Sequence, residues 1–335
     1  MNFFEDLYGN YEQKAYFSSL ITEGKCAHAY ILEAPAGGGK KSFALRIAAS
    51  LAWQTEPCDE EHEKKCKRIL EGISPDVLML TREEGKKTIG VEATRDFCAT
   101  AYLTPSELNF KMYIFDEADR ITPQAQNALL KIIEEPPRGV YMLLLCENSL
   151  SLLSTVRSRA QKIRLQTFDE DELRRFAKSS AIPETQDEEK LTFAFRMAHG
   201  AIGKLYHLLD NESFEFSAYS AAKKIIEGQV AKDRGVSYFD FFKHICDFVT
   251  AREALDALTG YLLSAYGDLA RAKATEDAKP SFFTADEAEE YSMFFAASAL
   301  AKSFSATETI RSDMRLNTSL PLSAAKLAVE LWAAV

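Results

Sequence analysis

The sequence predicts an α/β domain, with a parallel sheet flanked by helices, followed by two all-α domains. Three observations predict this order. Short apolar runs alternate with helical patterns up to about residue 165, a glycine-rich loop follows the first run, and strand patterns stop from Thr167 onward. Strand–helix alternation is typical of parallel sheets that carry helices on their faces. The length of 335 residues suits two or three domains, each with a core of its own.

Five apolar runs are the expected strands, and they are residues 28–32, 77–80, 112–115, 140–146 and 161–165. Runs that are apolar on both faces are typical of buried strands in a parallel sheet. Helices are expected between them, at residues 42–53, 91–102 and 123–134. The last of these helices has a clear start and end, because Thr122 offers a capping hydroxyl before Pro123, and Pro136 follows the helix.

Beyond residue 165 the chain has only helical patterns, which are continuous from about residue 237. Thr167-Phe168-Asp169-Glu170 has the pattern of a capping box and predicts a helix start. A glycine-rich break at 200–203 interrupts the helical pattern, and Thr284 with Glu287 predicts another helix start after a break at Pro280. These features predict three domains, at residues 1–166, 167–210 and 211–335, with the last boundary between 210 and 235.

Composition argues against several classes of protein. The chain has 40 Lys and Arg residues against 50 Asp and Glu, which gives a net charge of −10 and a pI near 5.2. Because phosphate backbones bind basic surfaces, this balance argues against a protein that coats nucleic acid by itself, although partners could bring it to DNA. No apolar run reaches the ~18 residues of a membrane span, and no secretory signal is visible. We therefore expect no membrane contact and a cytoplasmic location.

The six cysteines are too scattered for a disulfide framework. Cys58, His62 and Cys66 follow a Cys-x3-His-x3-Cys spacing inside a strongly charged stretch. One interpretation is a solvated loop with two reduced thiols. The other is a zinc site, because a helical segment would place all three side chains on one face, although structural zinc takes four ligands.

A degenerate phosphate-binding loop follows the first expected strand. The P-loop pattern G-x-x-x-x-G-K-[ST] cradles phosphates with backbone N–H groups, and its hydroxyl binds magnesium. Gly39 and Lys40 fit this pattern, but Ala34 replaces the first glycine and Lys41 takes the hydroxyl position, with Ser42 one residue late. No nucleotide binding, weak nucleotide binding and ATP hydrolysis all remain open. The candidate nucleotide-binding residues in the loop are Ala34, Gly37, Gly38, Gly39, Lys40, Lys41 and Ser42.

Asp116 and Glu117 end the apolar run at 112–115, as in a Walker-B strand. There the aspartate holds magnesium and the glutamate polarises water. The alternative interpretation is a pair of loop carboxylates that Arg120 neutralises.

Five motifs resemble those of a known family: His28-Ala29-Tyr30, Ser74-Pro75-Asp76, Asn127 to Pro137 (NALLKIIEEPP), Thr155 to Ala160 (TVRSRA) and Arg315-Leu316-Asn317. The chain resembles the AAA+ clamp-loader subunits of bacterial DNA polymerase III, and among them the delta-prime type. This resemblance implies an AAA+ core, a helical lid and a helical collar that assembles a pentameric ring. It also implies that Arg159 is an arginine finger, reaching the ATP of a neighbouring subunit.

The chain departs from the family pattern at the zinc module and at the sensors. The family's four zinc-binding cysteines fall here on Leu51, Glu60, Glu63 and Cys66, so the module, at about residues 56–72, is eroded. The sensor-2 arginine of active members falls near Gly203-Lys204, and sensor-1 near Glu147-Asn148.

The resemblance implies a stator subunit without ATPase activity of its own, in a clamp loader that places the sliding clamp on primed DNA. Its implied partners are the motor (tau/gamma) and delta subunits, with the clamp and primer-template DNA reached through the assembly. Two alternatives stay open, an active tau/gamma-type ATPase and an AAA+ protein outside replication. No cofactor is certain, and a weakly bound nucleotide and a zinc ion remain candidates.

Overall fold

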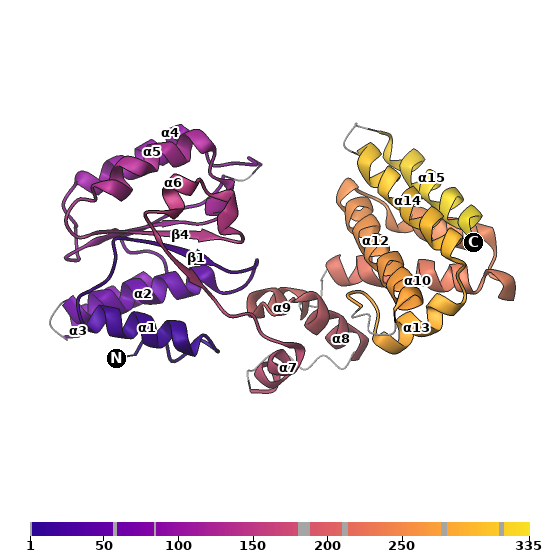
Figure 1. Cartoon of the computed structure of the whole chain (residues 1–335), viewed down its shortest axis with the longest axis horizontal. Coiled ribbons are helices and arrows are strands. Elements are labelled where there is room, and N and C mark those ends of the chain that lie inside the picture. The colour runs from indigo at the N-terminus through magenta and orange to yellow at the C-terminus, as the bar shows by residue number, and fades with distance from the viewer. Residues whose placement is uncertain are drawn as a thin grey trace. The chain divides into compact units, whose positions relative to one another are not determined.

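The computed structural model describes residues 2–55, 59–83, 85–179, 188–209, 214–275, 280–314 and 318–335. The chain forms two compact units, coloured by position along the chain in Figure 1. The first unit is Met1–Ala181 with His199–Lys204, and the second is Ile182–Ala198 with Leu205–Val335. The three-domain division drawn from the sequence stays a prediction.

A five-stranded, all-parallel sheet forms the centre of the first unit, as the sequence predicts. Its strands are β1 (Ala29–Glu33), β2 (Val77–Leu80), β3 (Lys111–Phe115), β4 (Val140–Cys146) and β5 (Gln161–Arg164), in the order β2-β3-β4-β1-β5. Strand β1 therefore lies inside the sheet, between β4 and β5, and delivers the glycine-rich loop to the carboxyl edge. Ligands of open parallel sheets bind at that edge.

Helices cover both faces of the sheet (Figure 1). The helices of this unit up to the sheet's last strand are α1 (Tyr11–Thr22), α2 (Lys40–Thr55), α3 (Glu60–Leu70), α4 (Val91–Ala99), α5 (Pro123–Glu134) and α6 (Ser154–Arg157). Side chains alternate between the faces, so that Leu32 and Ile31 of β1 are buried in two different core clusters. Edge strand β5 is mostly exposed, which corrects the expectation that all five runs are buried on both faces.

The helix after the sheet, α7 (Glu170–Ser179), starts two residues later than its expected capping box. Asp169 accepts a hydrogen bond from the Glu172 N–H at 2.7 Å, and the Glu172 carboxylate accepts one from the Asp169 N–H at 2.9 Å. Phe168 cannot join the helix, because its N–H donates to the carbonyl of Gly200 and its ring packs on Tyr8. The predicted box at Thr167 is therefore wrong in register.

The remaining helices are α8 (Glu188–Met197), α9 (Ile202–Leu209), α10 (Phe214–Val230), α11 (Tyr238–Phe248), α12 (Arg252–Ala274), α13 (Ala285–Met293), α14 (Ala297–Asp313) and α15 (Leu320–Ala334). Helix α9 begins in the first unit and continues in the second. The Thr284–Glu287 capping box is confirmed, whereas α10 lies before the point at which the sequence predicted continuous helix. The motif Arg315-Leu316-Asn317 lies outside the described residues. Within the described ranges, no helix has both the length and the apolar character needed to cross a bilayer.

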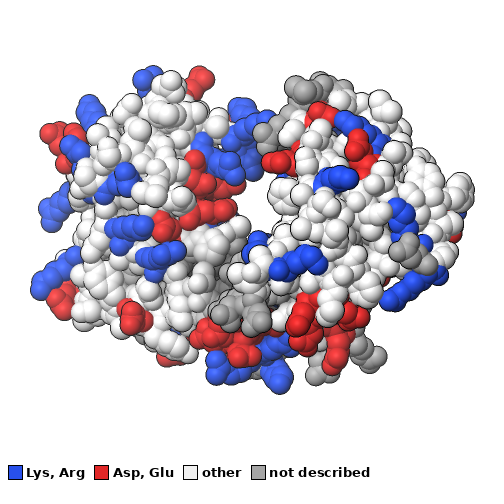
Figure 2. All heavy atoms as spheres, turned by 45° about the vertical axis from the view of Figure 1, so that its right-hand side comes forward, with Lys and Arg blue, Asp and Glu red and all other residues white. Residues whose placement is uncertain are grey.

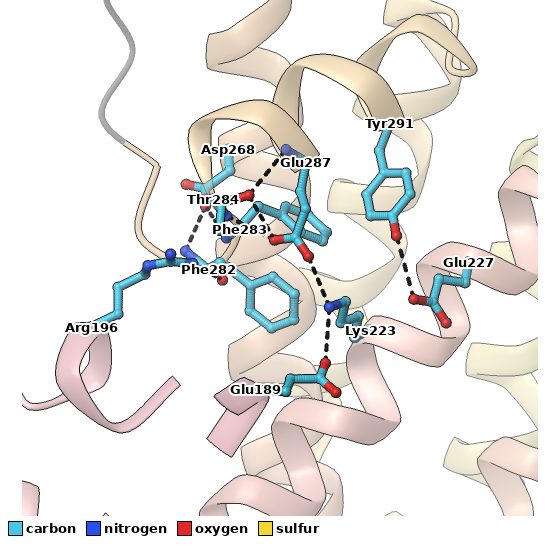
Figure 3. Close-up of polar contacts among 10 residues, drawn as sticks. All are labelled: Glu189, Arg196, Lys223, Glu227, Asp268, Phe282, Phe283, Thr284, Glu287 and Tyr291. Atoms are coloured by element: carbon cyan, nitrogen blue, oxygen red, sulfur yellow. Dashed lines mark hydrogen bonds and ion pairs between the residues drawn. The ribbon is translucent and has the colours of Figure 1, made fainter. Parts of the chain in front are cut away.

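A polar network joins α8 to the other helices of the second unit (Figure 3). Lys223 of α10 pairs with Glu189 of α8 and with Glu287 of α13, each at 2.9 Å. Burial opposes the charge on Lys223, but the two carboxylates outweigh it and raise the lysine pKa. The loop before α13 is held by Asp268, a fully buried side chain that accepts the N–H groups of Phe282 and Phe283.

A second buried aspartate, Asp76, plays the same part in the first unit. It follows Ser74-Pro75, precedes β2 and has no exposed surface. Its carboxylate accepts the backbone N–H groups of Ser106, Glu107 and Leu108 at 2.8, 2.6 and 2.9 Å. Backbone donors that turn toward the interior need acceptors, and Asp76 supplies both of its oxygens.

We expect Asp76→Asn to lower the free energy of unfolding of the first unit by about 2–3 kcal/mol, because an amide N–H₂ would face a backbone donor. Urea unfolding, followed by a probe in the first unit, measures this loss. Asp96→Asn, at an exposed position of α4, is the matched control and should change little. An unfolding midpoint unchanged by Asp76→Asn would contradict the role given to this carboxylate.

Glu33, the last residue of β1, is buried and holds three parts of the first unit together. Its Oε2 accepts the Ser149 N–H at 2.7 Å and pairs with Lys162 of β5 at 3.0 Å. Burial opposes its ionisation, but the hydrogen bond from Ser149 and the charge of Lys162 prevail and lower its pKa from 4.5 to about 2. Its contribution to stability is therefore present above about pH 4.5 and is lost as the pH falls toward 2.

Lowering the pH from about 6 to about 3.5 should reduce the free energy of unfolding of the first unit by about 1 kcal/mol, because Glu33 takes up a proton in the unfolded chain but stays ionised in the folded one. Glu33→Gln should be less stable at the higher pH and should lose less stability on acidification than the unsubstituted chain. Denaturant unfolding at the two pH values measures the difference, with Glu12→Gln, at an exposed site of α1, as the control. Equal pH dependence in both chains would refute the assignment.

Candidate functional site

The degenerate P-loop and the acidic end of β3 meet in one cavity of about 460 Å³ at the carboxyl edge of the sheet. Its lining residues are Ala36, Gly37, Gly38, Gly39, Lys40, Lys41, Ser42, Asp116, Glu117, Asp119, Glu147 and Gly203. All the predicted nucleotide-site residues except Ala34 therefore lie around a common space. On the face shown in Figure 2, acidic and basic side chains are interspersed on both units, with no continuous basic surface.

The loop keeps the backbone shape of a phosphate cradle, but its lysine is turned onto the loop itself. Gly37 and Gly39 have φ values of +71° and +78°, which glycine adopts without strain. The Lys40 ammonium donates to the carbonyl of Ala34 at 2.7 Å and to that of Pro35 at 2.9 Å. Burial lowers the pKa of Lys40, against the attraction of nearby carboxylates such as Glu147 and Asp116.

The balance of charge in the cavity is acidic. Four carboxylates line it, against the two ammonium groups of Lys40 and Lys41. Lys41 stands where a P-loop offers the hydroxyl that binds magnesium, and a lysine cannot ligate a cation. This lining therefore gives a triphosphate little of the positive surround that phosphate sites provide.

Glu117, at the Walker-B glutamate position, is paired with an arginine that the sequence did not suggest. Its backbone has φ +50°, an uncommon conformation for a residue other than glycine. Arg82, two residues beyond β2, places its Nε 3.1 Å from the Glu117 carboxylate. The interpretation that Arg120 neutralises Glu117 is wrong, because Arg120 lies 3.9 Å from Asp119 instead. Arg82 follows β2 and Glu117 follows β3, and these parallel strands end at the same edge of the sheet. That placement is the sequence signal from which the pair could have been predicted.

The predicted sensor-2 position is occupied by a contact between two backbones. The N–H of Gly203, in the first turn of α9, donates to the carbonyl of Gly37 at 2.9 Å. A Cβ on Gly203 would lie 2.8 Å from that carbonyl oxygen, and a Cβ on Gly37 would lie 2.5 Å from the N–H nitrogen of Lys204. Both glycines are therefore required for this approach, which leaves no room for an arginine side chain at residue 203.

At the predicted sensor-1 position, Glu147 lines the cavity while Asn148 has a structural contact. The Asn148 side chain accepts the N–H of Leu150 at 2.9 Å and so caps the short 3-10 helix Ser149–Ser151. The Asn148 side chain therefore serves as a helix cap. Of the two residues, only Glu147 lines the cavity beside the P-loop.

Arg159 lies just beyond α6 and does not line the P-loop cavity. Its Nε is 2.8 Å from the carboxylate of Glu134, and its Nη1 donates to the carbonyl of Thr155 and the hydroxyl of Ser158. Its side chain is 40% exposed. An arginine in this place is unavailable to the chain's own cavity and open to a neighbouring molecule.

The α6 segment is tied to the Walker-B side of the unit by one buried glutamine. Gln126 of α5 donates to the carbonyl of Ile121 at 3.0 Å and accepts the N–H of Leu153 at 2.7 Å. The residue before α6 therefore has a fixed position relative to the loop that follows Asp116 and Glu117.

The predicted metal ligands fall partly outside the described residues. Cys58 lies there, while His62 and Cys66 are buried on one face of α3, with His62 Nε2 3.9 Å from Cys66 Sγ. The Trp53 ring packs against the imidazole of His62, and the Cys66 thiol points at the Ala49 carbonyl. The solvated-loop interpretation is therefore wrong from residue 60 onward. In the described part of the chain, no three His, Cys, Asp or Glu side chains form a metal-binding group, and the zinc site stays a prediction.

The match to a known protein family lies within the first unit. The profile of the family described as DNA polymerase III, delta subunit, matches residues 9–169. The delta-prime subunit of DNA polymerase III from Yersinia pestis is 36% identical over 140 residues, which cover 41% of this chain and 41% of that protein. The delta-prime subunit from Bacillus subtilis is 36% identical over 151 residues, with 44% of each chain covered.

A gamma subunit of DNA polymerase III is also similar. The protein from Buchnera aphidicola subsp. Acyrthosiphon pisum is 30% identical over 215 residues, which cover 62% of this chain and 58% of that protein. This chain spans about half the length of the curated relatives that it matches. The residues that the family profile matches, 9–169, include the P-loop, the Walker-B carboxylates and Arg159. By these matches, residues 9–169, which hold the parallel α/β sheet, are similar to subunits of DNA polymerase III.

Proposed function

We propose that this protein is a delta-prime-like stator of the clamp loader, a subunit that does not hydrolyse ATP itself. The observation that carries this proposal is the contact between Gly203 and Gly37. In an active ATPase of this family, a sensor-2 arginine would stand near residue 203 and reach toward the nucleotide. Here a backbone hydrogen bond of 2.9 Å fills that place and holds the P-loop against α9.

Three further features of the cavity agree with a subunit that has lost hydrolysis. The Lys40 ammonium donates two hydrogen bonds to carbonyls of its own loop. Lys41 stands at the position where a P-loop has its magnesium-binding hydroxyl. Glu117, which would polarise the attacking water, is paired with Arg82. Three glycines and a helix N-terminus remain, so weak nucleotide binding without turnover is compatible with this proposal.

In this proposal Arg159 acts outside its own subunit. It lies away from the P-loop cavity, and its side chain is partly exposed and held by short contacts. A guanidinium keeps its charge and can bind phosphate oxygens through several N–H groups. We assign Arg159 the role of an arginine finger toward the ATP of an adjacent motor subunit.

The proposed setting is the DNA polymerase III holoenzyme in the cytoplasm. The direct partners would be the tau/gamma motor subunits and the delta subunit, and the sliding clamp and primed DNA would be reached through the assembly. The net charge of −10 agrees with a subunit whose direct partners are proteins.

The second candidate function is an active tau/gamma-type ATPase. It is favoured by the match to a gamma subunit, which covers more of this chain than either delta-prime match described above. The charge and packing of the cavity favour the stator. A third reading, an AAA+ protein outside replication, has no observation in its favour beyond the shared fold.

The purified chain should show no steady ATP hydrolysis, because Lys41 stands at the position of the magnesium-binding hydroxyl and Gly203 has no space for an arginine side chain. Phosphate release with and without primed DNA measures this, and Lys40→Ala should leave the background rate unchanged. A steady rate that Lys40→Ala abolishes would establish the motor alternative and remove the stator proposal.

Arg159→Ala should lower the DNA-stimulated ATPase of the reconstituted clamp loader while leaving its assembly intact. An arginine finger raises the hydrolysis rate at the ATP site that it serves by about 10³-fold or more. Arg159→Ala should therefore remove nearly all of the hydrolysis that this one site adds to the total rate of the complex. Phosphate release and gel filtration of the complex give the two readouts. Arg157→Ala, which removes an exposed arginine of α6, is the matched control. An unchanged rate with Arg159→Ala would remove the finger assignment.

A further inference from the structure

The guanidinium of Arg159 is held on two of its three sides by its own subunit. Glu134 Oε1 lies 2.8 Å from Nε, which occupies one side. Nη1 donates to the Thr155 carbonyl at 3.1 Å and to the Ser158 hydroxyl at 3.3 Å, which occupies the second. Among the described residues no hydrogen bond is found for Nη2, whose two N–H groups are thus the ones left for an outside acceptor.

Both partners of this ion pair are placed by rigid elements. Glu134 is the last residue of α5. Thr122 caps the start of this helix, and the buried side chains of Leu129 and Ile133 anchor it. Arg159 follows α6, which is anchored by Val156, a fully buried residue. The backbones of both residues are therefore placed by packed helices, directly at the end of α5 and just after α6.

Stability gives no reason for this pair. The side chains of Glu134 and Arg159 are 46% and 40% exposed, and exposed ion pairs add about 0–1 kcal/mol to folding. A carboxylate beside the guanidinium also offsets its positive charge. If Arg159 acted by its charge alone, Glu134 would weaken it, whereas a finger that must meet phosphate at a fixed angle gains from a partner that orients it.

We propose that Glu134 is a positioning residue for Arg159. By accepting the Nε hydrogen bond, it fixes the plane of the guanidinium and directs Nη2 outward, toward the phosphate oxygens of a nucleotide held by the neighbouring subunit. This inference rests on the proposed role of Arg159 as an arginine finger and adds the group that orients it.

The test uses the reconstituted clamp loader with DNA-stimulated ATP hydrolysis. The difference in rate between the unsubstituted complex and the Arg159→Ala complex defines the share of the site that Arg159 serves. Glu134→Ala should remove more than about half of that share through kcat, with little change in the KM for ATP, because misalignment acts on the transition state. Glu134→Gln should restore most of it, because its amide oxygen still accepts from Nε.

Two controls separate positioning from a structural effect. Glu135→Ala removes the neighbouring exposed carboxylate, for which no contact with Arg159 is found, and should leave the rate unchanged. Gel filtration of the complex and urea unfolding of the chain should be the same for the Glu134 variants and the unsubstituted protein.

The possible results separate this inference from the one on which it rests. An unchanged or higher rate with Glu134→Ala would overturn positioning, and a higher rate would show that Glu134 restrains the arginine. Equal losses with Glu134→Ala and Glu134→Gln would overturn it too, since the accepting oxygen would then not be the cause. If Arg159→Ala itself has no effect, the finger proposal fails first, and this inference fails with it.

Discussion

The hydrogen bond between Gly203 and Gly37 is the contact on which the character of the P-loop cavity depends. It brings the first turn of α9 against the loop at a backbone-to-backbone distance that only two glycines allow. Through it, Gly203 in the first turn of α9 becomes part of the cavity wall. The loop keeps its left-handed glycines, yet the Lys40 ammonium that should meet phosphates is satisfied by carbonyls of the loop.

Charged side chains around the carboxyl edge of the sheet are paired with one another. Arg82 meets Glu117, and Lys41 stands where magnesium needs a hydroxyl oxygen. On the outside of the same unit, Glu134 and Arg159 form a pair that is short but exposed. In the stator role proposed above, Arg159 would be the cation that this subunit offers to a neighbouring subunit.

Loops in both units are organised by buried carboxylates. Asp76 binds three successive backbone N–H groups before β3, and Asp268 binds those of Phe282 and Phe283 before α13. One buried carboxylate in each unit therefore holds the loop that leads into β3 or into α13. Asp76 belongs to a motif that supported the family resemblance, and its burial gives the motif a structural reason.

The sequence alone determined the parallel sheet, its five strands, the caps at Thr122 and Thr284 and the candidate residues of the cavity, because these follow from local periodicity and from motif spacing. It misplaced the start of α7, because Phe168 is held by the distant carbonyl of Gly200, and it left open whether the segment from Glu60 is a loop or a helix. Only the tertiary structure decided that Arg82 pairs with Glu117, that Glu134 holds Arg159, and that Gly203 abuts Gly37. Each of these contacts joins residues at least 25 positions apart, and such pairings are set by how the helices pack on the sheet, which no local pattern records.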